Sequence, residues 1–274
     1  MRVFDIELKD RFPFIEDSGL NPVLRCYLPD EISEMKRAKP RRASILICPG
    51  GGYFMCSERE AEPVTLPLLA NDFNVFILYY SCSPAHYPTQ LLQVAAAYET
   101  IHKNADEWFC DKDKIGIMGF STGGHLAAHY SNAYDSSAVR EVFPDSKKPF
   151  CSVLCYPVIT AETKDAHTGS FIGLLGDNPQ NLEKFSCDKM VTDDTPPAFI
   201  WHTVEDTTVP VQNSLLYAKA LSDNGVSYTM HIYPYSVHGL STLSENINEG
   251  LNEKNLLAKG WMDELIKWLK ILTK

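Results

Sequence analysis

A serine near the middle of the chain lies in a pattern that suits a nucleophile. Ser121 is the central residue of GFSTG at 119–123, which matches G-x-S-x-G. The residues before it, KIGIM, are typical of a strand, and those after it, TGGHLAAHYSNA, are typical of a helix. A serine at such a sharp strand-to-helix turn exposes its hydroxyl above the sheet. The alternative is a glycine-rich turn in which Ser121 only caps the helix.

The base and the acid that such a serine requires follow later in the chain. A serine hydroxyl is a poor nucleophile at neutral pH, so it needs a base and a third group that orients the base. Asp206 lies in HTVEDTTVP at 202–210, after the strand-like AFIWH, and His238 lies in YPYSVHG at 233–239, after SYTMHIY. Both should lie at the carboxyl ends of strands, beside Ser121. The order serine, acid, histidine predicts a nucleophile at Ser121, an orienting acid at Asp206 and a base at His238.

Neighbouring residues fit the role of the acid less well. Glu205 is nearer the strand, where the alternation of side chains points it the other way. Asp193 and Asp194 precede the strand and should fall at the wrong end of the sheet. His202 lies within the strand, and we interpret it as a core histidine or one that supports the site indirectly. Asp206 is therefore the predicted acid.

Two histidines on the predicted helix raise the question of a metal site. His125 and His129 have the spacing of the zinc motif H-E-x-x-H, but the residues between them are Leu-Ala-Ala, without the glutamate. We therefore expect no metal ligands here, and we interpret His125 as packing beneath the turn at Ser121. The chemistry predicted above needs no metal and no organic cofactor.

Acyl transfer also needs donors for the oxyanion that forms as the serine attacks. Backbone N–H groups serve well because they are fixed before the reaction. The N–H of Thr122, directly after the nucleophile, is one candidate. A second donor loop is PGGGY at 49–53, after the strand-like SILIC, where Gly51 is the predicted donor and Gly50, Gly52 and Tyr53 are expected to line the oxyanion or substrate site. No phosphate-loop motif follows, and the remaining alternative is a plain tight turn.

Short apolar segments alternate with helical patterns along the chain. Strands are predicted at 44–48, 75–80, 114–118, 152–156, 198–202 and 227–233, and helices at about 60–70, 88–103, 122–132, 211–223 and 253–272. The first 30 residues are expected to form two antiparallel strands. This alternation predicts an α/β fold with a mostly parallel sheet covered by helices on both faces.

We expect residues 1–274 to form one domain, with an irregular insertion at 158–197. That stretch contains several glycines and prolines and no long periodic segment. A long irregular insertion in a compact domain is often a lid or a binding loop, and the alternative is a surface excursion.

The charge of the chain argues against nucleic acid and anionic membranes as partners. It has 25 Lys and Arg against 35 Asp and Glu, a formal net charge of −10. Its basic cluster is interpreted as a solvated loop, and consists of Lys36, Arg37, Lys39, Arg41 and Arg42.

Neither export nor membrane insertion is indicated. The segment MRVFDIELKDRF lacks the apolar core of a signal peptide, and no apolar stretch approaches the roughly 20 residues that span a bilayer. The eight cysteines form no C-x-x-C pair. We therefore expect reduced thiols and a cytoplasmic location.

From about residue 44 onward, the chain resembles an α/β-hydrolase of the esterase/lipase superfamily, and it is most similar to bacterial acetyl-xylan-esterase-like and feruloyl-esterase-like members. The similarity lies in PGGGY at 49–53, YYSCSPAHYP at 79–88, GFSTGGHLAAH at 119–129, HTVEDTTVP at 202–210 and YPYSVHG at 233–239. It implies the hydrolase fold and the Ser121, Asp206 and His238 roles.

The chain departs from the lipase branch of this superfamily at several positions. Pro49 stands where many relatives have the histidine of HGGG, and Phe120 stands where the hormone-sensitive-lipase branch usually has aspartate. Cys82 and Ser83 interrupt the segment that corresponds to Y-R-L-A-P. These differences favour the carbohydrate-esterase-like branch.

The resulting expectation is a serine hydrolase that cleaves small carboxylic esters, deacetylating sugars or short oligosaccharides. The bulky Tyr53, Phe54 and Met55 beside the donor loop are expected to crowd the acyl pocket. An arylformamidase-like amidase would use the same three residues. A non-catalytic binding protein with the hydrolase fold is the alternative from another class, although such proteins typically lack one of the three.

Overall fold

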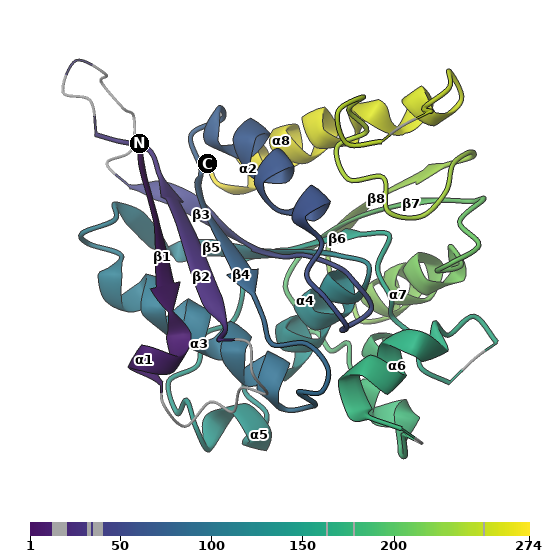
Figure 1. Ribbon diagram of the computed structural model, residues 1–274, viewed down its shortest axis with the longest axis horizontal. Helices are drawn as coiled ribbons and strands as arrows, with labels where there is room; N and C mark the ends of the chain where they lie inside the picture. Colours follow the sequence, from purple (N-terminus) through teal and green to yellow (C-terminus); the bar gives the residue numbers. More distant parts are fainter. Residues whose placement is uncertain (13–20, 32–33, 35–40, 163, 178, 249) are drawn as a thin grey trace.

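The central feature of the molecule is a single eight-stranded sheet (Figure 1). The computed structural model describes residues 1–12, 21–31, 34, 41–162, 164–177, 179–248 and 250–274. Within these residues the strands follow the order β1-β2-β4-β3-β5-β6-β7-β8 across the sheet. They are β1 (Arg2–Glu7), β2 (Val23–Leu28), β3 (Arg42–Cys48), β4 (Asn74–Tyr79), β5 (Cys110–Phe120), β6 (Ser152–Cys155), β7 (Ala198–Thr203) and β8 (Tyr228–Tyr233).

The sheet is antiparallel at one edge and parallel over the rest. Strand β1 pairs antiparallel with β2, and β2 pairs antiparallel with β4. From β4 through β3, β5, β6 and β7 to β8, all neighbours are parallel. The carboxyl ends of six strands therefore meet at one edge, where loops that carry functional side chains can converge.

Helices cover both faces of the sheet (Figure 1). The α-helices of the described residues are α1 (Leu8–Arg11), α2 (Glu62–Leu69), α3 (Thr89–Asn104), α4 (Thr122–Ala133), α5 (Ser137–Arg140), α6 (Thr168–Leu175), α7 (Gln212–Asp223) and α8 (Trp261–Leu272). Short 3₁₀ helices are η1 (Glu58–Glu60), η2 (Leu182–Phe185), η3 (Cys187–Lys189) and η4 (Asn255–Gly260). Helices α2 and α8 pack on one face, and α3, α4 and α7 pack on the other.

Alternation along the strands divides the interior into two cores. In β3, Ile45 and Ile47 contribute to the core beneath α2 and α8, whereas Leu46 and Cys48 contribute to the core beneath α3, α4 and α7. All four side chains are at most 2% exposed. A strand buried on both faces has no polar side of its own, which explains the continuous apolar run ILIC at 45–48.

The predicted elements are confirmed, with small shifts at their ends. The six predicted strands correspond to β3 to β8, and the two antiparallel strands near the start are β1 and β2. The helix predicted at 60–70 begins at Glu62, after η1, and the helix predicted at 253–272 is divided into η4 and α8. The segment at 158–197 contains the short helix α6 and the 3₁₀ helices η2 and η3, joined by irregular stretches.

The interpretation of the basic cluster as a solvated loop is wrong for Arg42. Its side chain is 1% exposed and bonds the carboxylates of Glu31 and Asp72 at the start of β3. Burial of an arginine is favourable only when its donors are paired, and these two acids supply that pairing. Arg41 is exposed, whereas Lys36, Arg37 and Lys39 lie outside the described residues.

Among the described residues, no helix is long and apolar enough to cross a bilayer.

Candidate active site

Ser121 occupies a strained turn between β5 and α4. Its backbone has φ 53° and ψ −119°, a conformation that a non-glycine residue adopts only when its surroundings impose it. Gly123 permits the close approach of β3, because a Cβ atom there would lie 2.0 Å from the carbonyl oxygen of Cys48. The turn therefore presents the Ser121 side chain at the carboxyl edge of the sheet, as the G-x-S-x-G pattern predicts.

The three residues predicted to act together lie in one hydrogen-bonded line. His238 Nε2 is 2.8 Å from Ser121 Oγ, and His238 Nδ1 is 2.6 Å from Asp206 Oδ2. A carboxylate only accepts, so Nδ1 carries the proton and Nε2 is left as the acceptor for the serine hydroxyl. This is the tautomer that a general base for Ser121 requires.

Asp206 is held as an ionised carboxylate. Its side chain is fully buried, and Oδ1 accepts the backbone N–H groups of Thr208 and Val209 at 3.0 and 2.9 Å. Burial alone would raise the pKa of Asp206, but hydrogen bonds from His202 and His238 outweigh it and hold the pKa well below its ordinary value. The acid is therefore charged at neutral pH and can orient the imidazole.

His202 supports this acid from within β7. Its Nε2 donates to the carbonyl of Val209 at 2.9 Å and lies 3.3 Å from Asp206 Oδ2, while Ser214 donates to its Nδ1 at 2.8 Å. The side chain is fully buried. This agrees with the prediction that His202 supports the site from the core.

The backbone N–H groups of Gly51 and Thr122 have no hydrogen-bond partner among the described residues. Thr122 is the first residue of α4, where N–H groups have no partner within the helix. Gly51 has φ +130°, and a Cβ atom there would lie 2.2 Å from the carbonyl oxygen of Met55, so only glycine fits. These are the two donors predicted for the oxyanion.

Three other residues of the loop have different roles from those expected. The N–H of Gly50 donates to Glu60 Oε2 at 2.8 Å, and the N–H of Gly52 donates to Thr122 Oγ1 at 2.9 Å, so neither is free to bind an oxyanion. The Tyr53 side chain is fully buried, and its hydroxyl lies 2.8 Å from His125 Nδ1. The expectation that Tyr53 lines the acyl pocket is therefore wrong for its side chain.

Phe54 and Met55 remain at the surface of the same loop. They are 55% and 57% exposed. Their side chains lie against Gly52 and Gly51 respectively. They are thus exposed bulky residues beside the proposed oxyanion donor Gly51.

The segment at 158–197 packs against this loop. Helix α6 packs on it so closely that a Cβ atom on Gly173 would lie 2.4 Å from the carbonyl oxygen of Gly52. At the start of the insertion, the Val158 N–H donates to the Ser121 carbonyl at 3.0 Å. The insertion is thus part of the surroundings of the turn at Ser121.

The competing residues do not join the hydrogen-bonded line. Glu205 accepts the N–H of Ser236 at 3.3 Å, and Asp194 pairs with Lys148. His125 and His129 are buried side by side in α4, and burial lowers the pKa of His125 to about 4 and that of His129 to about 3. Among the described residues, no group of three or more His, Cys, Asp or Glu side chains could hold a metal ion.

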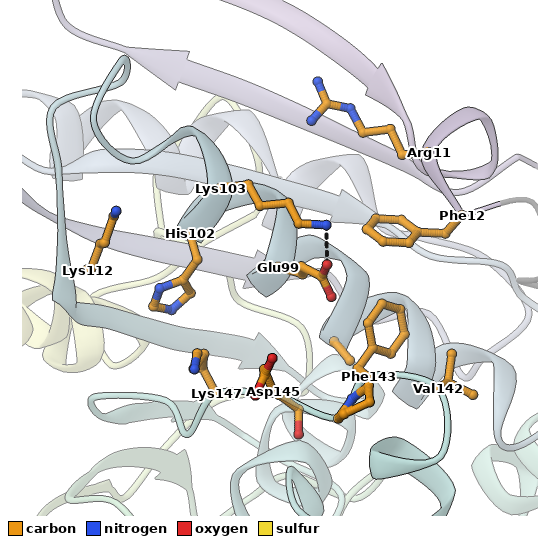
Figure 2. Close-up of a pocket in the computed structure, with 13 residues that line it drawn as sticks. Arg11, Phe12, Glu99, His102, Lys103, Lys112, Val142, Phe143, Asp145 and Lys147 are labelled. Atoms are coloured by element: carbon orange, nitrogen blue, oxygen red, sulfur yellow. Dashed lines mark ion pairs between the residues drawn. The ribbon is translucent and has the colours of Figure 1, made fainter.

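A cavity of about 390 Å³ reaches His238 and is lined also by Arg59, Leu240 and Asn255. A larger cavity, of about 810 Å³, lies between α3 and the segment at 142–147 and contains none of the three residues (Figure 2). Its lining includes an ion pair between Lys103 and Glu99. Of Ser121, Asp206 and His238, only His238 lines the smaller cavity.

Sequence reasoning did not single out Glu60 or Tyr156. Both are almost completely buried, and the Tyr156 hydroxyl donates to Glu60 Oε1 at 2.8 Å. The ring of Tyr156 packs edge-on against that of His238, with centroids 5.0 Å apart. The available signal was weak: a glutamate ten residues after Gly50, at the start of a predicted helix.

A mostly parallel sheet, a serine on a strand-to-helix turn, and an acid and a histidine after later strands define the α/β-hydrolase fold. Within that class the chain belongs to the BD-FAE family, whose model matches residues 31–221.

The relatives include enzymes named for xylan and ester hydrolysis. The chain is 35% identical over 235 residues to endo-1,4-beta-xylanase B of Butyrivibrio fibrisolvens, covering 82% of this chain and 36% of that protein. It is 29% identical over 221 residues to an acetylxylan esterase of Xylanibacter ruminicola, covering 78% of this chain and 42% of that protein. The matches thus span less than half the length of these two relatives.

A solved structure matches this chain over nearly the whole length of both proteins. It is described as an acetyl ester-xyloside bifunctional hydrolase from Caldicellulosiruptor lactoaceticus. The TM-score is 0.85 at 34% sequence identity, and the match covers 99% of this chain and 97% of that one. The fold of the whole chain is therefore that of a known ester hydrolase.

Proposed function

We propose that this chain is a serine esterase that hydrolyses small carboxylic esters, with acetyl groups on sugars or short oligosaccharides as its substrate class. The observation that carries the proposal is the line from Ser121 Oγ through His238 to the charged Asp206, with contacts of 2.8 and 2.6 Å. The names of an acetylxylan esterase and an acetyl ester-xyloside hydrolase among the relatives support the substrate class.

In the first half of the reaction, Ser121 Oγ attacks the ester carbonyl while its proton passes to His238 Nε2. A bond forms between Oγ and the carbonyl carbon, and the carbonyl electrons move to the oxygen. Gly51 and Thr122 supply N–H groups to this oxyanion, and one such donor contributes roughly 3 kcal/mol. The ester C–O bond then breaks, and His238 returns the proton to the leaving alcohol.

In the second half, water replaces the alcohol. His238 takes a proton from the water, whose oxygen attacks the acyl carbon of the Ser121 ester. The bond to Oγ breaks, the proton passes from Nε2 to Oγ, and the carboxylic acid is released. Asp206 keeps its negative charge throughout and stabilises the imidazolium that forms twice in the cycle.

The first test compares hydrolysis of p-nitrophenyl acetate by wild type and Ser121→Ala at neutral pH. We expect rapid turnover by wild type and a loss in kcat on the order of 10³-fold or more in the variant. Acetylated xylo-oligosaccharides follow as substrates, with acetate release as the measurement. Equal, negligible rates in two folded proteins would contradict an esterase, and aryl formamides would then test the amidase alternative.

The length of the acyl chain is tested with the same assay. Phe54 and Met55 flank the donor loop, so we expect acetyl esters to be cleaved faster than octanoyl esters. Replacement of both by alanine should reduce this preference, because it opens the surface beside Gly51. Equal rates for the two esters with wild type would show that the site does not select short acyl groups.

We further infer a reducing, cytoplasmic setting for this enzyme. All eight cysteines are free, and seven of them are buried. Buried thiols in a chain with no disulfide among the described residues are typical of proteins kept reduced.

A further inference from the structure

We propose that Glu60 is a positioning residue for ester hydrolysis: its buried carboxylate holds both the oxyanion loop and the tyrosine that packs on the catalytic histidine. The inference rests on the proposed function. It assigns a role to a buried acid that takes no part in the proton transfers described above.

Glu60 lies at a sharp change of backbone direction between two helices, and its side chain is in the interior. It is the last residue of η1, and Ala61 after it has φ −106° and ψ −103°, which separates η1 from α2. The Glu60 residue is only 3% exposed. An acid is rarely buried to this extent unless donors satisfy it.

Two donors from distant parts of the chain meet this carboxylate. The Gly50 N–H donates to Oε2 and the Tyr156 hydroxyl donates to Oε1, each at 2.8 Å. Burial raises the pKa of Glu60, whereas the bonds from Tyr156 and Gly50 act in the opposite direction. Because both neighbours donate, the ionised form of the carboxylate satisfies them together.

The bond to Gly50 fixes the loop directly before the proposed oxyanion donor. The Gly50 backbone is confined against the turn at Ser121, since a Cβ atom on it would lie 2.9 Å from Ser121 Cβ and 2.7 Å from the Phe120 carbonyl oxygen. Its carbonyl accepts the Ser57 N–H at 2.9 Å, so the residue is held from both sides. The direction of the next N–H, that of Gly51, depends on this anchorage.

The bond to Tyr156 supports the base. The Tyr156 hydroxyl also accepts the Ser241 N–H at 2.9 Å, and Ser241 follows His238 by three residues. The Tyr156 ring lies edge-on to the imidazole at 70°. One carboxylate therefore connects the loop that binds the oxyanion with the surroundings of the imidazole that moves the proton.

Glu60→Gln tests this role with almost no change in volume. Glutamine has one acceptor oxygen and one donor NH₂ group, so it can accept only one of the two hydrogen bonds that the carboxylate accepts. We expect kcat for p-nitrophenyl acetate to fall about 10- to 100-fold with KM changed less than about threefold, because positioning acts on the transition state. Glu60→Ala, which loses both acceptors, should be slower than Glu60→Gln.

Tyr156→Phe provides the second variant, which removes one donor from the same carboxylate. We expect a fall in kcat, and the double variant Glu60→Gln/Tyr156→Phe should be less impaired than the product of the two single effects. If Glu60→Gln fails to fold, Tyr156→Phe carries the test with the same expected split between kcat and KM.

A second tyrosine–glutamate hydrogen bond, between Tyr79 and Glu58, serves as the matched control. The Tyr79 hydroxyl donates to Glu58 Oε2 at 3.1 Å at the exposed side of η1. Glu58→Gln and Tyr79→Phe should leave kcat and KM near the wild-type values. A similar fall in kcat in both pairs would overturn the positioning role.

The outcomes separate this inference from the proposed function. Labelling of Ser121 by a fluorophosphonate, followed by mass spectrometry, accompanies the kinetics and requires no substrate. A wild type that neither turns over ester nor reacts with the probe would contradict the esterase and the role of Glu60 together. An active wild type with Glu60→Gln and Tyr156→Phe equally active would contradict only the role of Glu60.

Discussion

Asp206 shows how the environment of a single side chain decides what it does in catalysis. It is buried without solvent contact, yet it remains charged because two histidines and two backbone N–H groups face it. Glu205, its neighbour in the chain, accepts the Ser236 N–H instead. Both residues lie in the segment that follows β7, and of the two it is Asp206 that bonds His238.

This difference predicts the effect of Asp206→Asn. The amide can donate to His238 Nδ1 and so favour the tautomer whose Nε2 cannot accept the serine proton. We expect kcat for p-nitrophenyl acetate to fall on the order of 10³- to 10⁴-fold, as in other enzymes with this arrangement. Glu205→Gln is the control and should retain most of the activity; a larger loss in that variant would reverse the assignment of the acid.

Helix α4 carries a second electrostatic feature, which concerns stability. His125 donates from Nε2 to the Phe185 carbonyl at 2.8 Å, and His129 stacks on Tyr87 with ring centroids 5.7 Å apart. Burial lowers the pKa of both, to about 4 and about 3. Both are therefore neutral in the folded protein at pH values where the unfolded chain, with a pKa near 6.5, takes up protons.

The sign of the pH dependence follows from these values. A histidine with a lowered pKa in the fold favours folding fully above pH 6.5 and loses that contribution as the pH falls toward the folded value. Below pH 6, each of the two should reduce the free energy of unfolding by up to about 1.4 kcal/mol per pH unit. His129→Phe keeps a ring against Tyr87 and should remove one of these contributions. Urea unfolding of both proteins at pH 7, 6 and 5 measures the difference, and parallel pH profiles would contradict it.

The molecule as a whole is organised by one sheet shared between two cores. Trp201 in β7 stacks on Trp261 of α8 at 4.9 Å, and the Trp261 indole donates to the Ser241 carbonyl at 3.0 Å. The C-terminal helix thus packs on the sheet and also contacts the segment that follows His238. Each buried strand contributes side chains to both cores. Unfolding of one core would therefore disrupt the strands on which the other core is built.

This sharing predicts that residues 1–274 unfold as one cooperative unit. We expect a single calorimetric transition in which the van't Hoff and calorimetric enthalpies agree, and coincident loss of tryptophan fluorescence and far-UV circular dichroism. Two transitions, or an early loss of tryptophan signal alone, would indicate that the part around α8 unfolds separately and would contradict the single domain.

The strands, the helices and the order of Ser121, Asp206 and His238 could be predicted because each depends on local pattern. The spacing of apolar residues indicates which face of a helix or strand is buried. The glycines around Ser121 indicate a tight turn, because larger side chains would clash there. The expected location of the three residues at one edge then follows from parallel strands, whose carboxyl ends coincide. In the tertiary structure the His238 side chain lies within hydrogen-bond distance of those of Ser121 and Asp206, at 2.8 and 2.6 Å.

What only the tertiary structure decides is which groups are already bonded. The N–H of Gly50 is occupied by Glu60 and that of Gly52 by Thr122, so of the three glycines only Gly51 keeps an N–H without a partner among the described residues. Arg42 is buried between acids that lie 11 and 30 residues away. Periodicity along a chain indicates which side chains are buried, but hydrogen-bond partners come from segments that packing brings together, and no local pattern records them.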